Sequence, residues 1–300
     1  MKLSEAIEKF YKWKKLNVKE GTINGYDLIL RQFCVFMRDC EIENISLDDI
    51  VKWFELMKQL GWDQNSFIPK TIALRKFFEF YIHQGYRVID PFLIPLPQKQ
   101  FKLPRVADEK TYKKLLTAIP RKTNDPRHIR NLAIITMLYD TGARNGEIVS
   151  LNISDVDTKR MRAVIKTEKA KTRRPIREIF WTRNTNENLK KWIKKRDHLK
   201  RILTFKDPEA LFISTTNSKA GYRFTIKGVG EMIRKYCNRA KIPYLNPHSF
   251  RHKLGHDLAN KNYNNSVISN ILGHSSLQSS YIYTLMTDKE LEAKYREARS

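Results

Sequence analysis

Four short motifs follow one another between residues 142 and 283 of this sequence. They are GARNGE around Arg144, HSFR from His248 to Arg251, LGH ending at His274, and the YIY that ends at Tyr283. Arginine guanidinium groups grip the non-bridging oxygens of a phosphate in pairs, and a tyrosine phenol can hold a phosphate covalently. A fold that brings these side chains together would suit phosphoryl transfer without a metal ion.

This ordered set resembles the tyrosine recombinase (integrase) family, whose catalytic domains carry Ala-Arg-x-Gly-Glu, His-x-x-Arg, Leu-Gly-His and then the tyrosine. The resemblance covers roughly the whole chain. It is strongest for compact Xer-like recombinases, and small mobile-element integrases share the plan. The resemblance implies a site-specific enzyme that cleaves and rejoins DNA through a 3′-phosphotyrosyl intermediate, with no cofactor, no ATP and no metal.

The resemblance also implies a role for each motif residue. Tyr283 would be the nucleophile, and Arg144 and Arg251 would stabilise the charge on the five-coordinate phosphorus. His248 would accept and return the proton of the nucleophile, and His274 would donate to a phosphate oxygen. Glu147 would orient its neighbours through hydrogen bonds, because a carboxylate that faced the phosphate would repel it.

Two tyrosines compete for the role of nucleophile. Tyr281 and Tyr283 lie two residues apart, which on a helix turns their side chains about 200° away from each other. Only one of them can therefore face the site. Tyr283 matches the family spacing from His274, and Tyr281 remains the alternative.

The general acid is sought in the hairpin turn, where the family places a lysine that protonates the departing 5′ oxygen. Lys166, Lys169 and Lys171 all lie in or beside that turn, which is about one residue shorter than the common family form. Lys169 gives the best match and Lys171 the next. We expect the other basic side chains of the segment to contact DNA, namely Lys166, Lys171, Arg173 and Arg174.

A metal site is the rival interpretation of the histidines. His248, His252 and His256 follow each other at intervals of four and would share one helix face, as zinc ligands can. The glutamate of the HExxH motif is absent, however, and Arg251 and Lys253 would put positive charge beside the ion. The sequence therefore favours a site with no metal.

The charge of the chain is high and uneven. Its formal net charge is +25, and residues 1–100 contain 15 Lys and Arg against 13 Asp and Glu, so the excess belongs to residues 101–300. The densest stretch runs from Lys159 to Arg183 with ten basic and two acidic residues. This distribution predicts a polyanionic partner, because basic side chains that neutralise phosphates release condensed counterions.

Periodicity and capping signals predict a mainly α-helical protein with a small β-sheet. Four helices are expected over 5–15, 23–38, 47–60 and 69–85, with Ser46 and Asp49 forming a capping box. They would form an N-terminal helical core-binding domain over residues 1–90, followed by a proline-rich linker over 91–106. Residues 107–300 would form an α+β tyrosine recombinase catalytic domain.

The expected elements of that second domain alternate helices and short strands. Helices are predicted over 108–119, 129–139, 186–201, 226–240 and 266–273, with one more that starts at Pro247. A hairpin is predicted from strands at 161–167 and 172–180, and a short strand at 211–214. Gly142 should end the apolar helix just before Arg144.

Further predictions concern partners and location. The family resemblance implies a homo-tetramer on two double-stranded DNA sites, with the helical segment 288–298 passed between protomers. Cys34, Cys40 and Cys237 show no CxxC spacing, and no signal peptide or run of 18 apolar residues is present. These features predict a cytoplasmic protein that binds no membrane and associates with the nucleoid when on DNA. A type IB topoisomerase and a non-catalytic DNA-binding protein remain the alternatives.

Overall fold

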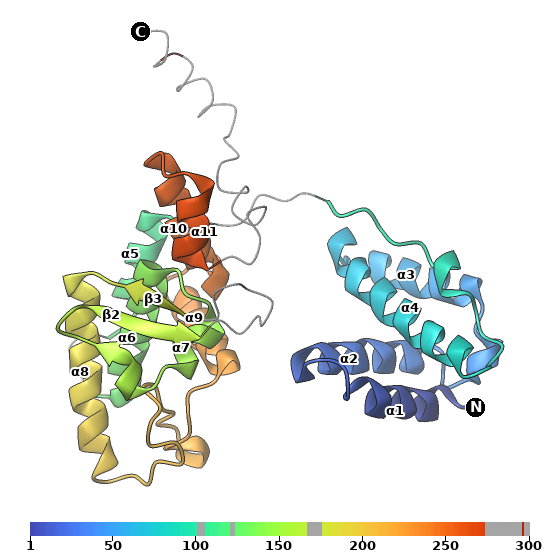
Figure 1. The fold of residues 1–300 in the computed structure, drawn as a ribbon, viewed down its shortest axis with the longest axis horizontal. Coiled ribbons are helices and arrows are strands. Elements are labelled where there is room, and N and C mark those ends of the chain that lie inside the picture. Colours follow the sequence, from blue (N-terminus) through green and yellow to red (C-terminus); the bar gives the residue numbers. More distant parts are fainter. Residues whose placement is uncertain (101–105, 121–123, 167–175, 274–295, 297–300) are drawn as a thin grey trace. The chain divides into compact units, whose positions relative to one another are not determined.

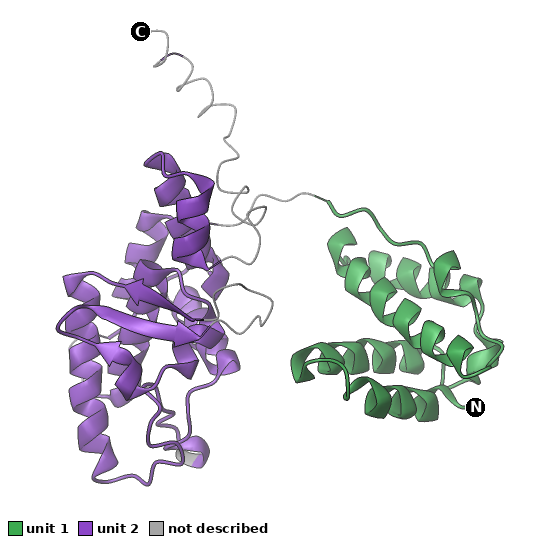
Figure 2. Ribbon diagram, in the orientation of Figure 1, with its two compact units in different colours: residues 1–102 green, residues 103–300 purple. Residues whose placement is uncertain are grey.

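The computed structural model describes residues 1–100, 106–120, 124–166, 176–273 and 296. Within them the chain is mainly helical and contains one small antiparallel sheet (Figure 1). It divides into two compact units, Met1–Lys102 and Leu103–Ser300, which are coloured separately in Figure 2. The predicted fold class is confirmed.

Unit 1 is built on an aromatic core between four α-helices, as the sequence predicts. The helices are α1 (Leu3–Lys14), α2 (Glu20–Phe36), α3 (Leu47–Gln59) and α4 (Phe67–His83). The start of α3 is the predicted capping box: Ser46 Oγ accepts from the Asp49 backbone N–H, and the Asp49 carboxylate accepts from the Ser46 N–H. Seven aromatic side chains are buried between the helices: Phe10, Phe33, Trp53, Phe67, Phe77, Phe78 and Tyr81.

The proline-rich segment after α4 begins with a short 3₁₀ helix, Pro91–Leu93, and then runs along unit 1. Ile94 is fully buried in the core of that unit, and its carbonyl accepts a hydrogen bond from Arg75 Nε at 2.9 Å. Further along, Asn65 Nδ2 donates to the Gln100 carbonyl at 2.9 Å. The part of the expected linker from residue 94 to residue 100 therefore packs against unit 1.

Unit 2 contains helices on both sides of a central buried helix, together with a three-stranded sheet. The helices are α5 (Glu109–Thr117), α6 (Pro126–Thr141), α7 (Asn145–Ser150), α8 (Arg183–Lys200), α9 (Ile226–Arg239), α10 (Pro247–Asn260) and α11 (Asn265–Leu272). The strands are β1 (Val156–Asp157), β2 (Arg162–Lys166) and β3 (Ile176–Phe180), in the order β1-β2-β3.

The predicted hairpin is confirmed by the antiparallel pairing of β2 with β3, from Arg162 opposite Phe180 to Lys166 opposite Ile176. Its turn lies outside the described residues. The strand expected at 211–214 is wrong. The segment makes one isolated bridge, between Ile213 and Arg223, and forms no strand of the sheet. The short elements α7 and β1 were not predicted.

Helix α6 forms the centre of unit 2. Its side chains Ala133, Ile134, Ile135, Met137 and Leu138 are fully buried, and α8 and α10 both pack against it. A helix that is apolar around most of its surface must be covered on several sides. The carboxyl end of α6 is thereby held in place, and the candidate site begins there. Among the described residues, none of the helices combines the length and the apolar composition that a membrane span requires.

Candidate active site

The turn after α6 directs the backbone toward Arg144. Gly142 ends the helix in the left-handed conformation with φ 56°, as its position before Arg144 predicts. A Cβ atom on Gly142 would lie 2.9 Å from Leu254 Cδ2, so a side chain there would push the Leu254 side chain of α10 aside. The hydroxyl of Thr141 accepts a hydrogen bond from the Ala143 N–H at 3.1 Å and so fixes the turn. Arg144 then caps the start of α7.

The same turn receives Arg251 from α10. Arg251 is only 3% exposed, and its Nη1 donates to the Gly142 carbonyl at 3.0 Å. Asn246 caps α10 by accepting from the Ser249 N–H, and Pro247 occupies the first turn, as predicted. His248 is exposed and lies three residues before Arg251, so the two side chains leave neighbouring positions of one helix face.

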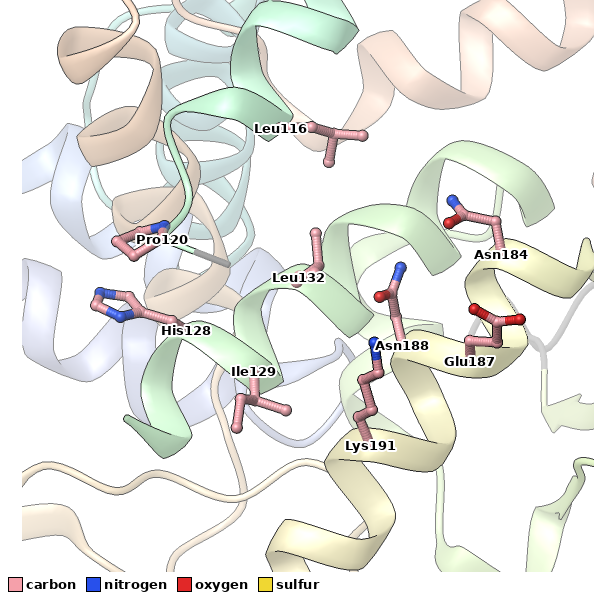
Figure 3. A pocket seen from close by; sticks show the side chains of 9 residues that line it. All are labelled: Leu116, Pro120, His128, Ile129, Leu132, Asn184, Glu187, Asn188 and Lys191. Carbon is pink, nitrogen blue, oxygen red and sulfur yellow. The ribbon is translucent and has the colours of Figure 1, made fainter. Parts of the chain in front are cut away.

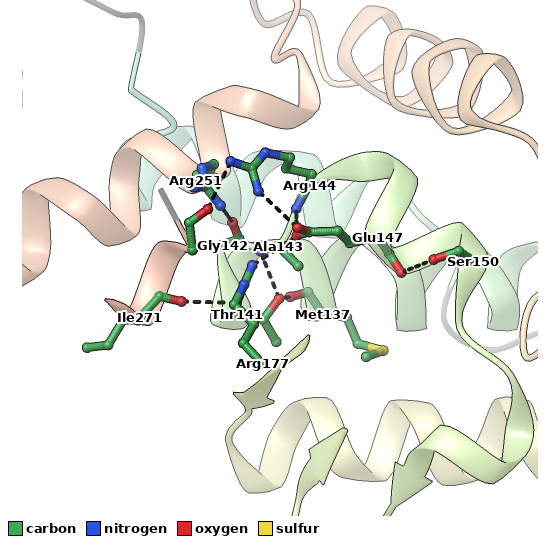
Figure 4. Close-up of polar contacts among 11 residues, drawn as sticks. Met137, Thr141, Gly142, Ala143, Arg144, Glu147, Ser150, Arg177, Arg251 and Ile271 are labelled. Carbon is green, nitrogen blue, oxygen red and sulfur yellow. Dashed lines mark hydrogen bonds and ion pairs between the residues drawn. The ribbon is translucent and has the colours of Figure 1, made fainter. Parts of the chain in front are cut away.

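Glu147 orients Arg144 by two hydrogen bonds. Its side chain is fully buried; Oε2 accepts from the Arg144 backbone N–H at 2.8 Å, and Oε1 accepts from Arg144 Nη1 at 2.9 Å (Figure 4). The Arg144 side chain is 18% exposed, so part of it is open to solvent. A buried carboxylate held in this way fixes the direction of the guanidinium group.

Arg177, on β3, is a residue of this cluster that the sequence did not reveal. Its Nη2 donates to Glu147 Oε2 at 2.9 Å, and its Nη1 donates to the Ile271 carbonyl at 3.0 Å (Figure 4). The side chain is 8% exposed. Burial lowers the pKa of Arg177, the negative charge of Glu147 raises it, and the positive charge of Arg144 lowers it.

The carboxyl end of α11 lies against both of these arginines. Gly273 ends the helix in the left-handed conformation with φ 66°, and its carbonyl accepts from Arg144 Nη2 at 3.1 Å. A Cβ atom on Gly273 would lie 2.4 Å from Arg177 Nε, so a larger residue there would displace the Arg177 side chain. The chain continues from here to His274. The structure therefore places Arg144 and Arg177 against Gly273, the residue that precedes His274.

Several predicted site residues lie outside the described residues. They are Lys169, Lys171, Arg173, Arg174, His274, Tyr281 and Tyr283, together with the segment 288–298 except for residue 296. Lys166 is described: it is the last residue of β2 and is exposed.

The histidine face of α10 has different environments along its length. Burial, together with smaller contributions from the nearby His248 and Arg251, lowers the pKa of His252 to about 4. His252 is therefore neutral at pH 7. Among the described residues, no group of three His, Cys, Asp or Glu side chains is arranged to hold a metal ion.

A pocket elsewhere in unit 2 is separate from this cluster. Figure 3 shows it between α5, α6 and α8, with Leu116, Leu132 and Lys191 among its lining residues. None of the predicted site residues lines it. It is therefore no part of the candidate active site.

Each of the two units matches a separate family model of known proteins. Residues 105–290 match the model of the phage integrase family, and residues 7–85 match that of the phage integrase N-terminal SAM-like domain. Tyrosine recombinase XerC of Roseiflexus castenholzii is 26% identical over 291 residues, which cover 94% of this chain and 89% of that protein. Tyrosine recombinase XerD of Oceanobacillus iheyensis is 26% identical over 303 residues, covering 98% of both.

Solved structures share the fold. The integrase of transposon Tn1549, in complex with a circular intermediate DNA, superimposes with a TM-score of 0.74 at 20% identity and covers 99% of both chains. The XerH site-specific recombinase, in a post-cleavage complex with palindromic difH substrate, gives a TM-score of 0.70 at 22% identity over 93% of this chain and 80% of that one. With the catalytic-domain match over most of its length and Xer recombinases as full-length relatives, this chain belongs to the phage integrase family and is a tyrosine recombinase.

Proposed function

We propose that this tyrosine recombinase cleaves and rejoins double-stranded DNA at specific sites, through a 3′-phosphotyrosyl intermediate on Tyr283. The observation that carries the proposal is the convergence of Arg144 and Arg251 on one turn, although they are far apart in the sequence. Guanidinium groups that are held in place before the substrate arrives stabilise developing charge without the cost of reorganisation. Such a pair suits the scissile phosphate.

In the cleavage step, the phenolic oxygen of Tyr283 attacks the phosphorus while the bond from phosphorus to the 5′ oxygen breaks. Ionising a free phenol at pH 7 costs about 4 kcal/mol, so its proton must be accepted as attack proceeds. His248, one helical turn from Arg251, is the proposed acceptor. Arg144 and Arg251 stabilise the five-coordinate phosphorus, and His274 donates a hydrogen bond to a phosphate oxygen.

The departing 5′ oxygen takes a proton from Lys169 and leaves as a hydroxyl. The phosphate stays joined to the 3′ end and to the tyrosine, so the energy of the broken ester is retained in the new one. A 5′-hydroxyl from the partner duplex then attacks this phosphotyrosine and reverses the step. Because the two arginines supply the positive charge at the phosphate, the chemistry needs no metal, ATP or other cofactor.

DNA is the proposed partner of both units. The solved relatives named above were captured with DNA, and the basic excess of residues 101–300 suits contacts with phosphates. We propose that residues 1–90 form the core-binding DNA domain, 91–106 the linker and 107–300 the catalytic domain. Four side chains of the hairpin would bind the DNA backbone beside the scissile phosphate: Lys166, Lys171, Arg173 and Arg174.

The proposed assembly is a tetramer on two DNA sites, formed on DNA in the cytoplasm, with the segment 288–298 passed to a neighbouring protomer. A chain that ends at Thr287 tests this exchange directly. It should still bind one site, yet it should fail to form complexes of four protomers on two sites in light scattering of the DNA complex. Full tetramer formation by the shortened chain would exclude the exchange.

The function is tested by incubating the protein with a duplex that is nicked next to the cleavage site. The short 5′-hydroxyl fragment diffuses away after attack, so the covalent adduct accumulates and can be resolved on a denaturing gel. Peptide mapping of the adduct should identify Tyr283. An adduct on Tyr281 would overturn the residue assignment, and the absence of an adduct on any cognate duplex would overturn the function.

A further inference from the structure

Arg177 joins three parts of unit 2 that are distant in the sequence. It extends from β3, one of the two strands of the hairpin that carries Lys169. Its guanidinium group donates to Glu147 of α7 and to the carbonyl of Ile271 at the end of α11. The hairpin, the Arg144 motif and the segment leading to His274 and Tyr283 are thus tied at one side chain.

The charges of this cluster do not cancel. Glu147 forms ion pairs with both Arg144 and Arg177, so two positive charges share one negative charge. If Arg144 were the only partner of Glu147, the pair would be neutral overall and would attract a phosphate less strongly. Because Arg177 takes part of the carboxylate's hydrogen bonding, the cluster keeps a net positive charge, and that charge lies beside the more exposed of the two arginines, Arg144.

Arg144 and Arg177 each bind a different carbonyl group at the end of α11. Arg177 Nη1 binds the carbonyl of Ile271, and Arg144 Nη2 binds that of Gly273. The last carbonyl groups of a helix lack partners within the helix, and positively charged groups stabilise them. Gly273 packs so closely on the Arg177 side chain that a larger residue would displace it. These two guanidinium groups therefore hold the end of α11 in place at Ile271 and Gly273.

We propose that Arg177 is a positioning residue for strand cleavage. It fixes the end of α11, from which the chain leads to Tyr283, against Glu147. It also leaves Arg144 with the positive charge that binds the scissile phosphate. The inference rests on the proposed function. It assigns Arg177 no contact with DNA. Its loss should slow the chemical step while DNA binding is retained.

The test compares Arg177→Lys with a matched control, Arg196→Lys, in the full-length chain. Arg196 is also buried, and it donates to two backbone carbonyls, of Ala210 and Pro208, away from the candidate site. Lysine keeps the charge but cannot span two acceptors in the manner of a guanidinium fork. For each variant we would measure DNA affinity, thermal unfolding and the single-turnover rate of adduct formation at saturating protein on the nicked duplex.

At saturation, Arg177→Lys should form the adduct about 10- to 100-fold more slowly than wild type, with near wild-type DNA affinity, because small misplacement of reacting groups costs rates of that order. Arg196→Lys should leave the saturated rate unchanged even if its melting temperature falls. A wild-type rate in Arg177→Lys, or an equal loss in both variants, would overturn the inference. The wild-type adduct is the separate criterion for the function itself.

A second pair of variants covers the case in which Arg177→Lys does not fold. Arg177→Met combined with Glu147→Gln removes a buried charge together with its partner, which folded proteins tolerate better than removal of one partner. Glu147→Gln alone keeps the bond from Arg177 to Ile271. The double variant should therefore cleave more slowly than Glu147→Gln alone. Equal rates in the two would show that Arg177 adds nothing to cleavage.

Discussion

Arg251 Nη1 lies 3.0 Å from the carbonyl oxygen of Gly142, and this hydrogen bond joins the HSFR motif to the ARNGE motif. Gly142 is in the left-handed conformation that ends α6, so its carbonyl is available to a donor from outside the helix. Arg251 is buried on α10, which packs against α6. The contact therefore fixes the relative position of the two arginines proposed to bind the scissile phosphate.

Replacing Arg251 by lysine should remove this connection while the positive charge is kept. The lysine ammonium cannot bind both the Gly142 carbonyl and a phosphate oxygen in the fork geometry of arginine. We expect the saturated rate of adduct formation to fall by about 100- to 1,000-fold, the range seen when one oxyanion donor is lost. Single-turnover gels measure it, and a loss no larger than in Arg196→Lys would contradict the role.

Replacing Tyr283 by phenylalanine should abolish the covalent adduct and leave DNA affinity close to that of wild type, because only a hydroxyl group is removed. Denaturing gels and an electrophoretic mobility assay measure the two properties. Tyr281→Phe is the matched control and should form the adduct normally. An adduct that persists in Tyr283→Phe would show that the nucleophile lies elsewhere.

Chelators should leave cleavage intact, because Arg144 and Arg251 supply the positive charge at the phosphate. The measurement is the adduct yield of the wild-type protein before and after dialysis against EDTA. A loss of activity that zinc restores would instead support a metal on the face formed by His248, His252 and His256.

Replacing Lys169 should slow cleavage of ordinary DNA far more than cleavage of DNA with a 5′-bridging phosphorothiolate at the scissile position. A thiolate leaving group has a much lower pKa than an alkoxide and hardly needs a proton, so loss of the acid matters little there. If the phosphorothiolate substrate restores cleavage by Lys171→Ala or Lys166→Ala but not by Lys169→Ala, the lysine replaced in the rescued variant is the general acid. Equal slowing of Lys169→Ala on both substrates would make Lys169 a DNA contact.

The folded state should lose stability between about pH 6.5 and pH 4 partly through His252. Its folded-state pKa is about 4, below the unfolded value of about 6.5, so the unfolded chain binds the proton first as the pH falls. This contribution is complete above pH 6.5. The free energy of unfolding, measured with urea, should fall less between pH 7 and pH 5 for His252→Gln than for wild type. The same substitution at the exposed His198 is the control, and equal differences in all three proteins would contradict the prediction.

Local signals in the sequence predicted most helices correctly. The Ser46 and Asp49 capping box, Pro247 in the first turn of α10 and Gly142 at the end of α6 all act within a few residues of their own position. The strand expected at 211–214 was wrong, because this buried segment pairs with residues 222–224 only over a single isolated bridge. An apolar run records burial and does not by itself specify strand pairing.

The sequence by itself determined the family and the candidate catalytic residues, because the four motifs and their order can be recognised in the sequence before the fold is known. Only the tertiary structure revealed Arg177. On β3 it shares the inner face of the sheet with Ile179, whereas Ile176 and Phe180 are exposed, so the alternation of apolar residues points to the wrong face. Its partners Glu147 and Ile271 lie 30 and 94 residues away. A charged side chain on an inner face is stable only when such distant groups satisfy it, and no local pattern records their approach.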